Sequence, residues 1–467
     1  MISYGEFLKS KEIVAAQSGF TVDKETLNPQ AFDWQKDVVA WALRKGRCAL
    51  FEDCGLGKTL QQLMWAGEVV KHTGKPVMIL APLAVVQQTK EEADKFGEVA
   101  IPVRSMEEIQ GTGVYAANYD IAEHFDLSGF GGVVLDESSI LKDFTSKTKN
   151  ILTEMCRDVE YKLCCTATPS PNDYTELGNH AEFLGIMTRT EMLATFFVHD
   201  GGNTSKWRLK GHAKQAFFSW IASWACCMTT PEDLGYSGDR YTLPPLRIVE
   251  HEVKADHLLD SEGQTMLFSP ATQTLSARRE ARRDSLEKRV ETAAEIANSS
   301  QEQFLVWCDL NAESQMLAQK ISGSVEVKGA DSPEHKIAAM QDFGAEKVKC
   351  LVSKPSIAGW GMNWQQCHRM IFVGLSDSFE AYYQAVRRCW RFGQKSPVIV
   401  DIVISDADGA VKANIERKQA EAEELTKELV KYTRDILRDD IKSTRRMRET
   451  YLATEKMIVP EWLEGAA

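Results

Sequence analysis

The sequence lacks several features that define whole classes of protein. Its 467 residues contain no uninterrupted apolar run of about eighteen, the length that a membrane-spanning helix needs. The first ten residues, MISYGEFLKS, do not have the shape of a secretory signal peptide. Internal repeats and low-complexity tracts are also missing. We therefore expect no association with a membrane and a cytoplasmic location.

Paired cysteine motifs are missing as well. The chain has 11 cysteines, an odd number, and no two of them form a C-x-x-C pair. Several lie inside apolar runs, for example Cys164 with Cys165 and Cys226 with Cys227. This pattern predicts reduced and buried thiols rather than a disulfide framework or a zinc site.

An excess of basic residues is also absent. The net charge is -12, from 55 Lys and Arg against 67 Asp and Glu, which argues against bulk affinity for nucleic acid. A local basic groove stays compatible with this total, because screening by salt makes nearby charges matter more than the sum. With 43% apolar residues, the length predicts roughly two to four domains.

The most informative stretch is FEDCGLGKTL, residues 51–60. The apolar residues 47–51 before it predict a buried strand, and the spacing of residues 61–70 after it predicts a helix. A glycine-rich turn between a strand and a helix is the context of a phosphate-binding loop. Backbone N–H groups of the turn and the open helix N-terminus then point at an anion. The alternative is an ordinary tight turn.

Each residue type of this loop suits a nucleotide. Gly55 and Gly57 let the backbone approach phosphate oxygens, Lys58 brings a positive charge to the β and γ phosphates of ATP, and Thr59 offers a hydroxyl to Mg²⁺. The first glycine of the general pattern is replaced by Glu52. The predicted nucleotide-binding residues of the loop are Cys54, Gly55, Leu56, Gly57, Lys58, Thr59 and Leu60.

Three further side chains in the first half are candidates for the same site. Gln35, on a predicted helix just before the loop, can read the edge of adenine, or it is a solvated helix residue. The apolar strand in GGVVLDESS ends in Asp136 and Glu137, at the strand end where ligands bind in such sheets. Asp136 would hold Mg²⁺ through water, and Glu137 would orient and deprotonate the attacking water. The alternative is a solvated turn.

The second half predicts another parallel sheet, from five apolar runs separated by helices, without a phosphate loop of its own. Its segment AYYQAVRRCWRFGQKS, residues 381–396, places Gln384, Arg388 and Arg391 on one side of a predicted helix. Such a face suits an anion opposite it, and the alternative is a salt-bridged surface helix.

Three other helical segments are expected. The aromatic stripe in residues 214–228 predicts core packing. The charged residues 276–298, including Lys288 and Arg289, suit either phosphates or a solvated face. Residues 410–454 predict long amphipathic helices docked on the second domain.

Read in order, the motifs match one family. They are Gln35, CGLGKT, APLAVVQQTKEE, ANYD, LDESSILKD, TATPSPNDYTELGNHAEFL, AGWGMNW and QAVRRCWRFGQ. The chain over residues 30–405 resembles the superfamily-two helicases. Within them it looks most like the Swi/Snf-type translocases on double-stranded DNA, in the small stand-alone form carried by phages and prophages.

This resemblance implies an α/β fold of two tandem RecA-like parallel-sheet domains with a helical C-terminal extension. We place the ATP-binding domain at residues 1–240, the second domain at 241–408 and the extension at 409–467. Arg388 and Arg391 take the role of arginine fingers. Gly361, Asn363 and Gln384 join the nucleotide site.

The implied function is hydrolysis of ATP, with Mg²⁺, in the cleft between the domains, coupled to movement along DNA. Duplex DNA is favoured, and contacts go mainly to the phosphate backbone. A monomer is expected in the cytoplasm of a bacterial host or phage-infected cell, with phage or host replication or recombination proteins as partners. Two alternatives stay open: a helicase that separates DNA or RNA strands, and an ATP-switched nucleic-acid-binding assembly factor.

Some positions depart from the family pattern. Ser139 stands where the family has histidine, and Thr89 where it usually has tryptophan. Arg387 and Trp390 replace the aspartate and histidine of the last motif. The positions of Ser139, Arg387 and Trp390 help to couple hydrolysis to DNA, so these departures bear on coupling rather than on hydrolysis.

Overall fold

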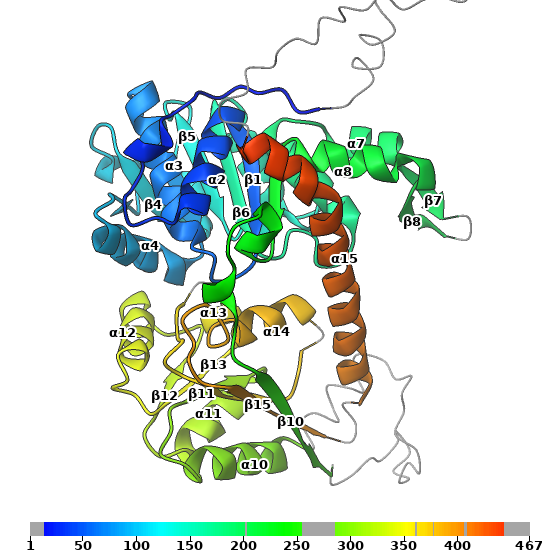
Figure 1. Ribbon diagram of the computed structural model, residues 1–467. Helices are drawn as coiled ribbons and strands as arrows, with labels where there is room; N and C mark the ends of the chain where they lie inside the picture. Colours follow the sequence, from blue (N-terminus) through cyan, green and yellow to red (C-terminus); the bar gives the residue numbers. More distant parts are fainter. Residues whose placement is uncertain are drawn as a thin grey trace, which may run out of the picture.

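The computed structural model describes residues 14–200, 203–254, 285–359, 362–376, 378–405 and 409–442. Two parallel β-sheets lie one above the other, each covered by helices, and one long helix runs along their side (Figure 1). This arrangement confirms the predicted α/β fold of two parallel-sheet domains.

The first sheet has seven strands in the order β3-β4-β2-β5-β6-β1-β9, all parallel. Its central strands are apolar throughout because helices cover both faces of the sheet. The strands are β1 (Arg47–Glu52), β2 (Val77–Ala81), β3 (Ile101–Pro102), β4 (Val114–Asn118), β5 (Gly132–Asp136), β6 (Tyr161–Thr166) and β9 (Ala225–Met228).

Seven helices of eight or more residues pack around this sheet in the described part of the first domain. They are α2 (Asp33–Lys45), α3 (Lys58–Thr73), α4 (Leu83–Phe96), α5 (Lys147–Met155), α6 (Leu177–Leu184), α7 (Arg189–Phe196) and α8 (Lys214–Ala222). An antiparallel hairpin of β7 (Phe197–Asp200) and β8 (Asn203–Leu209) lies between α7 and α8 and projects to one side (Figure 1).

The aromatic stripe of residues 214–228 is core, as predicted, but it is not one helix. Phe217, Trp220 and Trp224 are fully buried. The helix α8 ends at Ala222, and the chain then enters the sheet as β9. The apolar residues of β9 continue the pattern of the helix, so the sequence does not mark the change.

The second sheet has six parallel strands in the order β10-β15-β14-β11-β13-β12. The strands are β10 (Leu246–Val253), β11 (Phe304–Cys308), β12 (Ser324–Val327), β13 (Cys350–Ser353), β14 (Arg369–Val373) and β15 (Val398–Ser405). Its helices are α10 (Leu286–Asn298), α11 (Asn311–Lys320), α12 (Pro333–Gly344), α13 (Pro355–Ala358) and α14 (Phe379–Val386).

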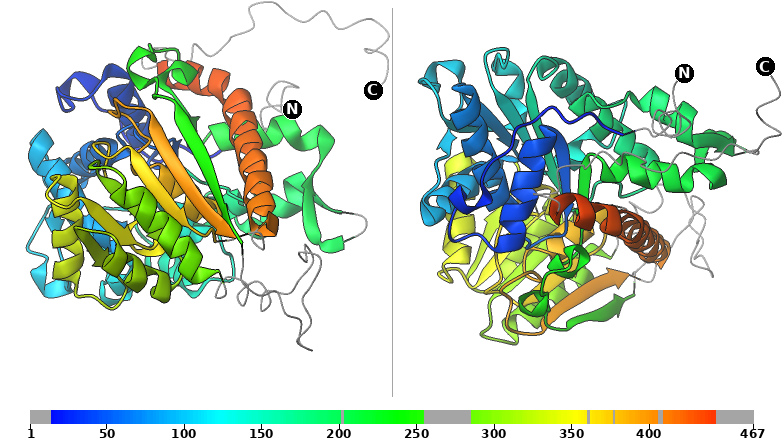
Figure 2. Two further views of the ribbon diagram at one scale, coloured as in Figure 1. Left: turned by 90° about the horizontal axis from the view of Figure 1, so that it is seen from below. Right: turned by 45° about the horizontal axis from the view of Figure 1, so that its top comes forward.

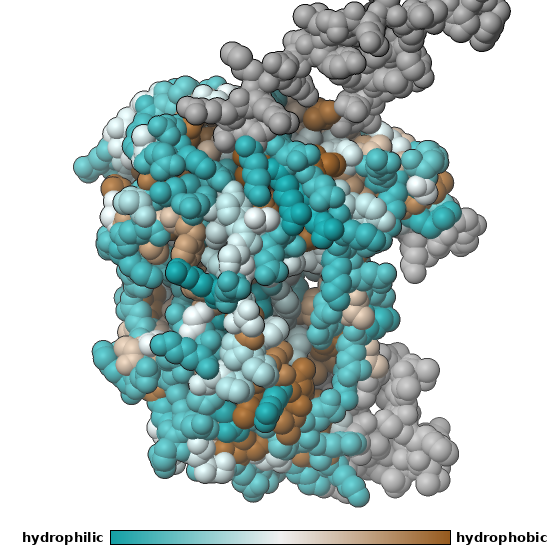
Figure 3. All heavy atoms as spheres, viewed as in Figure 1, coloured by the Kyte–Doolittle hydropathy of each residue, from teal (hydrophilic) through white to brown (hydrophobic). Residues whose placement is uncertain are grey.

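The edge strand β10 is absent from the sequence-based prediction. None of its residues is buried, and Ile248 and Val249 are 48% and 40% exposed. Apolar side chains gather over this edge of the second sheet (Figure 3). An exposed edge strand lacks the continuous apolar run by which the central strands are recognised.

The charged helix predicted over residues 276–298 is described only from residue 285 onward, as α10. Its Arg289 is fully buried and pairs with Glu313 of α11 at 2.7 Å. Arg289 is therefore available neither to phosphates nor to solvent, the two alternatives for this face. The arginines at 278, 279, 282 and 283 lie outside the described residues.

The described part of the C-terminal segment, residues 409–442, is one helix, α15 (Gly409–Lys442). At 34 residues it is about 50 Å long, at roughly 1.5 Å per residue, and so reaches both domains. Val411 and Ile415 join the core of the second domain, whereas Leu429 and Leu437 join the cores of the first. The segment docks on the second domain as predicted, and its apolar stripe continues past that domain onto the first, which the prediction did not include (Figure 2).

The predicted state of the cysteines is confirmed. All 11 are free, and all but the half-buried Cys54 are buried. Among the described residues, no helix has both the length and the apolar character needed to cross a bilayer.

Candidate active site

The candidate site lies where the first sheet faces the second domain. The phosphate loop leaves the carboxyl end of β1, and Asp136 and Glu137 lie at the carboxyl end of β5. Helix α14 of the second domain and the turn after it lie against the same edge. Carboxyl ends of parallel strands are where ligands bind in such sheets.

The phosphate loop has the backbone shape that an anion requires. Gly55 and Gly57 have φ of 89° and 78°, a conformation that residues with a Cβ rarely adopt. A Cβ on Gly57 would lie 2.4 Å from Nε2 of Gln35, so space as well as conformation demands glycine. Helix α3 begins at Lys58 without a side-chain cap, which leaves its first N–H groups open toward the cleft.

Lys58 is held by the loop itself. Its Nζ donates to the carbonyl oxygens of Glu52 and Asp53, at 2.8 and 3.0 Å. The Glu52 carboxylate is fully buried and accepts a hydrogen bond from Nε2 of Gln61 at 2.8 Å. Burial raises the pKa of Glu52 to about 7. The residue that replaces the first glycine is thus packed beneath the loop, not in the cleft.

Gln35 braces the loop from α2. Its Nε2 donates to the carbonyl of Leu56 at 2.9 Å, and its Oε1 accepts the N–H of Phe32 at 3.0 Å. A side-chain amide has two donors and two acceptor lone pairs, so one of each stays available for a base. The rings of Tyr241 and Phe392 lie near this region, 4.9 Å apart. The adenine contact of Gln35 stays a prediction.

Asp136 is fixed by groups that sequence reasoning missed. Its Oδ1 accepts hydrogen bonds from Nε2 of Gln62 at 2.8 Å and from the N–H of Glu137 at 3.0 Å. Tyr119 donates to its carbonyl at 2.8 Å. Gln62 lies one turn after Thr59 on α3, and this spacing is the signal that could have identified it.

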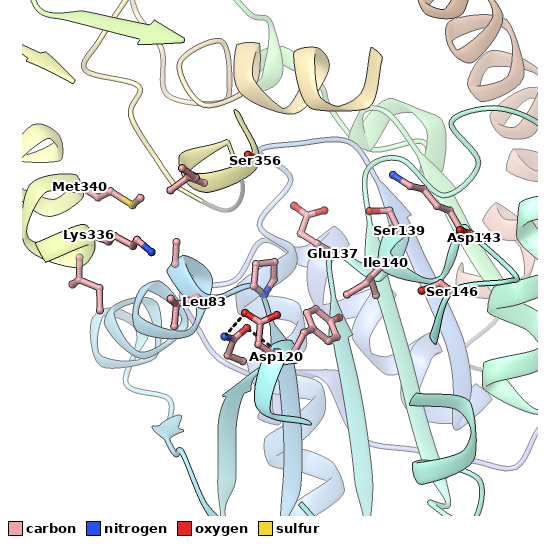
Figure 4. A pocket seen from close by; sticks show the side chains of 17 residues that line it. Leu83, Asp120, Glu137, Ser139, Ile140, Asp143, Ser146, Lys336, Met340 and Ser356 are labelled. Atoms are coloured by element: carbon pink, nitrogen blue, oxygen red, sulfur yellow. Dashed lines mark hydrogen bonds between the residues drawn. The ribbon is translucent and has the colours of Figure 1, made fainter. Parts of the chain in front are cut away.

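Glu137 is held in an uncommon backbone conformation with a buried carboxylate oxygen. Its φ of 55° is uncommon for a residue with a side chain and is the kind of backbone strain that clusters at functional sites. Its Oε2 is buried and has no hydrogen-bond partner among the described residues. Burial, then the charge of Asp136, raises the pKa of Glu137 to about 7, against the lowering effect of Lys58 and Arg388. The carboxyl projects into the cleft (Figure 4).

Arg388 and Arg391 enter the cleft from the second domain. Helix α14 ends at Val386, so both lie in the turn after the helix, not on the continuous helix that we predicted. Arg388 is buried and donates to the carbonyl and to Oε1 of Gln384, both at 2.8 Å. Both arginines also donate to the carbonyl of Met362, at 3.3 and 3.2 Å. Burial and the neighbouring Arg388 lower the pKa of Arg391 to about 10.

Three predicted residues of the nucleotide site remain, namely Gln384, Asn363 and Gly361. Nε2 of Gln384 and Oδ1 of Asn363 are buried and without a partner among the described residues. Asn363 also donates weakly to Glu92, at 3.4 Å. Gly361 lies outside the described residues.

The site fits a polyphosphate with a divalent ion. Among the described residues, Oε2 of Glu137, Oδ1 of Asn363 and Nε2 of Gln384 are buried without a partner, and the N-terminus of α3 has no side-chain cap. No cluster of three or more His, Cys, Asp or Glu side chains that could hold a metal occurs in the described ranges. The metal-binding role of Thr59 and Asp136 stays a prediction. Such a set suits Mg²⁺, which keeps waters and phosphate oxygens around it.

The residues that depart from the family pattern have defined places. Ser139 lines the groove described below. Trp390 donates from Nε1 to the carbonyl of Pro244 at 2.8 Å. Arg387 pairs with Asp53 of the phosphate loop at 2.7 Å, and Tyr383 donates to the same carboxylate at 2.6 Å. Sequence reasoning did not identify Asp53 or Tyr383.

A groove of about 620 Å³ opens beside the carboxylates, between the two domains. Lys336, Met340 and Ser356 line it from the second domain (Figure 4). From the first domain it is lined by the N-terminal end of α4, by the turn after β4 and by residues 137–146, which include Glu137, Ser139 and Lys142. Glu137 therefore belongs to both the cleft and the groove.

Two family models match the chain in this order. One, described as SNF2-related domain, covers residues 34–197, and the other, Helicase conserved C-terminal domain, covers residues 285–393. The curated relatives include two proteins described as DNA annealing helicase and endonuclease ZRANB3. The one from Mus musculus is 28% identical over 36% of this chain and 17% of its own length. The one from Bos taurus is 26% identical over 42% and 20%. The chain thus spans about a fifth of these relatives.

Solved structures also resemble the chain. S. cerevisiae Dbp5 bound to RNA and ADP BeF3 has a TM-score of 0.55 at 12% identity, over 85% of this chain and 93% of that one. This likeness shows the fold of two tandem RecA-like domains. The Sulfolobus solfataricus SWI2/SNF2 ATPase core in complex with dsDNA is 17% identical over 87% of this chain and 98% of that one, with a TM-score of 0.42.

Proposed function

Because the chain belongs to the SNF2-related group of superfamily-two helicases, we propose that it is a motor that hydrolyses ATP and moves along DNA. The observation that carries this proposal is the composition of one cleft. It contains a phosphate loop and two carboxylates from the first domain, and two arginines of the second domain lie near enough to act on it, Arg388 on Glu137 and Arg391 on Cys54. A site divided between two domains can turn hydrolysis into a change of their closure.

The residues of the first domain divide the work of binding and proton transfer. The loop N–H groups and Lys58 bind the phosphates of ATP, and Gln35 reads adenine with its spare donor and acceptor. Thr59 and Asp136 hold Mg²⁺, which neutralises phosphate charge when bound. Glu137 orients the attacking water and accepts its proton. Its pKa of about 7 matches a base that works near neutral pH.

The residues of the second domain act on the transition state. Phosphoryl transfer spreads negative charge over the γ-phosphate oxygens, and Arg388 and Arg391 stabilise that charge when the cleft is closed. Gln384 orients Arg388 through two hydrogen bonds. Asn363 and Gly361 complete the proposed nucleotide site from the preceding motif.

We place the nucleic acid in the groove between the domains. Lys142, Lys336 and Ser356 line it from both domains and suit a phosphate backbone, although the carboxylates of Asp120, Glu137 and Asp143 line it too and Lys142 pairs with Glu380. Duplex DNA is the substrate that we favour, and the names of two similar proteins mention DNA. Because the groove has walls from both domains, its shape changes whenever the cleft opens or closes.

The same proposal covers the organisation and the partners. The strands of the first sheet end at Met228 and those of the second begin at Leu246, which supports a division into 1–240, 241–408 and 409–467. We also propose that the protein is a monomer and that its partners are replication or recombination proteins of a phage or its host.

The test is a steady-state ATPase measurement with duplex DNA, single-stranded DNA and RNA in parallel. We expect slow hydrolysis alone and a stimulation of tenfold or more by duplex DNA. Stimulation by single strands or RNA alone would favour a strand-separating helicase. Turnover that no nucleic acid changes would favour an ATP-switched assembly factor.

A further inference from the structure

The phosphate loop is held from the opposite domain by residues that the proposed chemistry does not use. Nη2 of Arg387 lies 2.7 Å from Oδ2 of Asp53 and donates to the carbonyl of Cys54 at 3.0 Å. The hydroxyl of Tyr383 donates to the other oxygen of Asp53 at 2.6 Å. Both carboxylate oxygens of one loop residue are thus bound by the second domain.

The arginine of this contact is buried, and the side chain of Asp53 is 24% exposed. Arg387 is only 4% exposed, and its guanidinium lies 5.8 and 5.2 Å from the ring centres of Tyr383 and Trp390. Burial alone lowers the pKa of Arg387, but Asp53 and Tyr383 outweigh this and raise it overall. In such surroundings the charge pair is screened far less than a surface pair.

The other end of α14 carries a charge pair of opposite polarity. Glu380, which is 5% exposed, pairs with Lys142 of the first domain and accepts a hydrogen bond from Thr168 at 3.3 Å. At the C-terminal end of α14, the cation Arg387 therefore meets the anion Asp53 of the first domain. At its N-terminal end, the anion Glu380 meets the cation Lys142 of the first domain. This arrangement favours a single docked position of the helix, because a shifted or reversed helix would bring like charges together.

Because of the position of Asp53 in the loop, this contact also affects the backbone that binds phosphate. Asp53 and Cys54 directly precede Gly55, and Lys58 donates to the carbonyl of Asp53. The segment after α14 also packs on Gly55, where an added Cβ would lie 2.9 Å from Phe392. Restraint of Asp53 by the second domain therefore restrains the backbone that binds phosphate.

We propose that Arg387 is a positioning residue that latches the second domain onto the phosphate loop through Asp53, with Tyr383 as its support. The latch keeps the cleft closed before nucleotide arrives and couples closure to the conformation of the loop. Arg388 and Arg391 are then delivered to the same place. The inference deepens the proposed function and rests on it, since it assigns these contacts to the same nucleotide site.

The experiment is a double-mutant cycle with two readouts. Asp53→Asn, Arg387→Gln and the double variant are compared for kcat with saturating ATP and DNA. In parallel, their radius of gyration without nucleotide or DNA is measured by small-angle X-ray scattering. Arg417→Gln is the matched control, because Arg417 pairs only within the exposed face of α15.

We expect each single variant to lower kcat about tenfold and to increase the radius of gyration, with an unchanged melting temperature within a few degrees. The double variant should be no worse than either single one, because each removes the same interaction. Arg387→Lys should restore part of the activity, and Tyr383→Phe should cost less than Arg387→Gln.

Two results overturn the latch: losses in kcat that multiply in the double variant, and a radius of gyration in Arg387→Gln that equals that of the wild type. If Arg387→Gln does not fold, Asp53→Asn and Tyr383→Phe give the same comparison from the other side. The scattering measurement needs neither ATP nor DNA. It therefore decides on the latch even if the protein proves not to be a DNA-stimulated ATPase.

Discussion

Replacement of Arg388 by alanine tests whether the turn after α14 carries an arginine finger or only a surface ion pair. The side chain of Arg388 is buried and makes three hydrogen bonds, two to Gln384 and one to the carbonyl of Met362. Nε, Nη1 and Nη2 each donate one of these bonds, so three separate donors of one planar group are engaged. If the arginine stabilises the transition state, its loss costs about 10³- to 10⁵-fold in turnover. If it belongs to a surface ion pair, the interaction is worth about 1 kcal/mol at most, or roughly fivefold.

The backbone of Arg388 is hydrogen-bonded as well, and its carbonyl accepts the N–H of Trp364 at 3.0 Å. This bond survives a change of side chain and helps to keep the turn in place. We expect Arg388→Ala to lower turnover at least about a hundredfold at saturating ATP and DNA, about 2.7 kcal/mol of transition-state stabilisation. Nucleotide affinity should change much less, because Lys58 and the loop N–H groups stay. Arg391→Ala should behave in the same way.

Stability must be measured beside turnover, since the alanine leaves Oε1 of Gln384 without its charged partner. An unsatisfied buried acceptor costs about 1–3 kcal/mol, so a lower melting temperature is expected in Arg388→Ala. Arg388→Lys keeps the charge but offers one nitrogen where three are used, and should rescue turnover poorly. The assays are steady-state ATPase, a nucleotide-binding titration and thermal unfolding of each variant. Turnover within about threefold of wild type in folded Arg388→Ala and Arg391→Ala would refute the role of arginine fingers.

Three other outcomes are expected. Lys58→Ala should keep its fold and lose ATP turnover, because Lys58 contacts only loop carbonyls; ATPase and thermal unfolding check this, and hydrolysis at the wild-type rate would exclude the phosphate loop. Glu137→Gln should bind ATP and DNA without turnover, because it lacks the base. In the wild type, kcat/KM should fall about tenfold per pH unit below pH 7, because protonation of Glu137 at a pKa of about 7 removes the base. A flat pH profile, or a Glu137→Gln variant as active as wild type, would place the base elsewhere. DNA affinity should fall with salt by about 0.9 log unit per log unit of salt for each phosphate neutralised, with little dependence on sequence, in a fluorescence titration; a salt-independent affinity or one preferred short duplex would contradict backbone binding.

The central strands of both sheets could be predicted from the sequence for a physical reason. Strands such as β1, β5 and β11 are covered on both faces, so their residues are apolar without interruption and end in turn residues. The phosphate loop could be predicted because glycines at φ near 80°, a lysine and a helix start must follow one another in the chain. In both cases the determining interactions are local.

The features that the sequence did not reveal depend on distant parts of the chain. Helix α14 ends at Val386 although helix-compatible residues follow, because Trp364 takes the carbonyl of Arg388 and Pro244 binds Trp390. The pair of Asp53 and Arg387 joins the two domains, and no periodicity links residues so far apart. Strand β10 is recognisable only by its pairing with β15.

The measurement that tests the central claim most directly is displacement of the third strand from a DNA triplex. A motor that moves along duplex DNA removes that strand when ATP is hydrolysed, without separating the duplex beneath. We expect wild-type protein with ATP to displace it, and Lys58→Ala, or wild type with a non-hydrolysable ATP analogue, to leave it bound. Duplex-stimulated hydrolysis without any displacement, or displacement that Lys58→Ala performs equally well, would contradict an ATP-driven translocase.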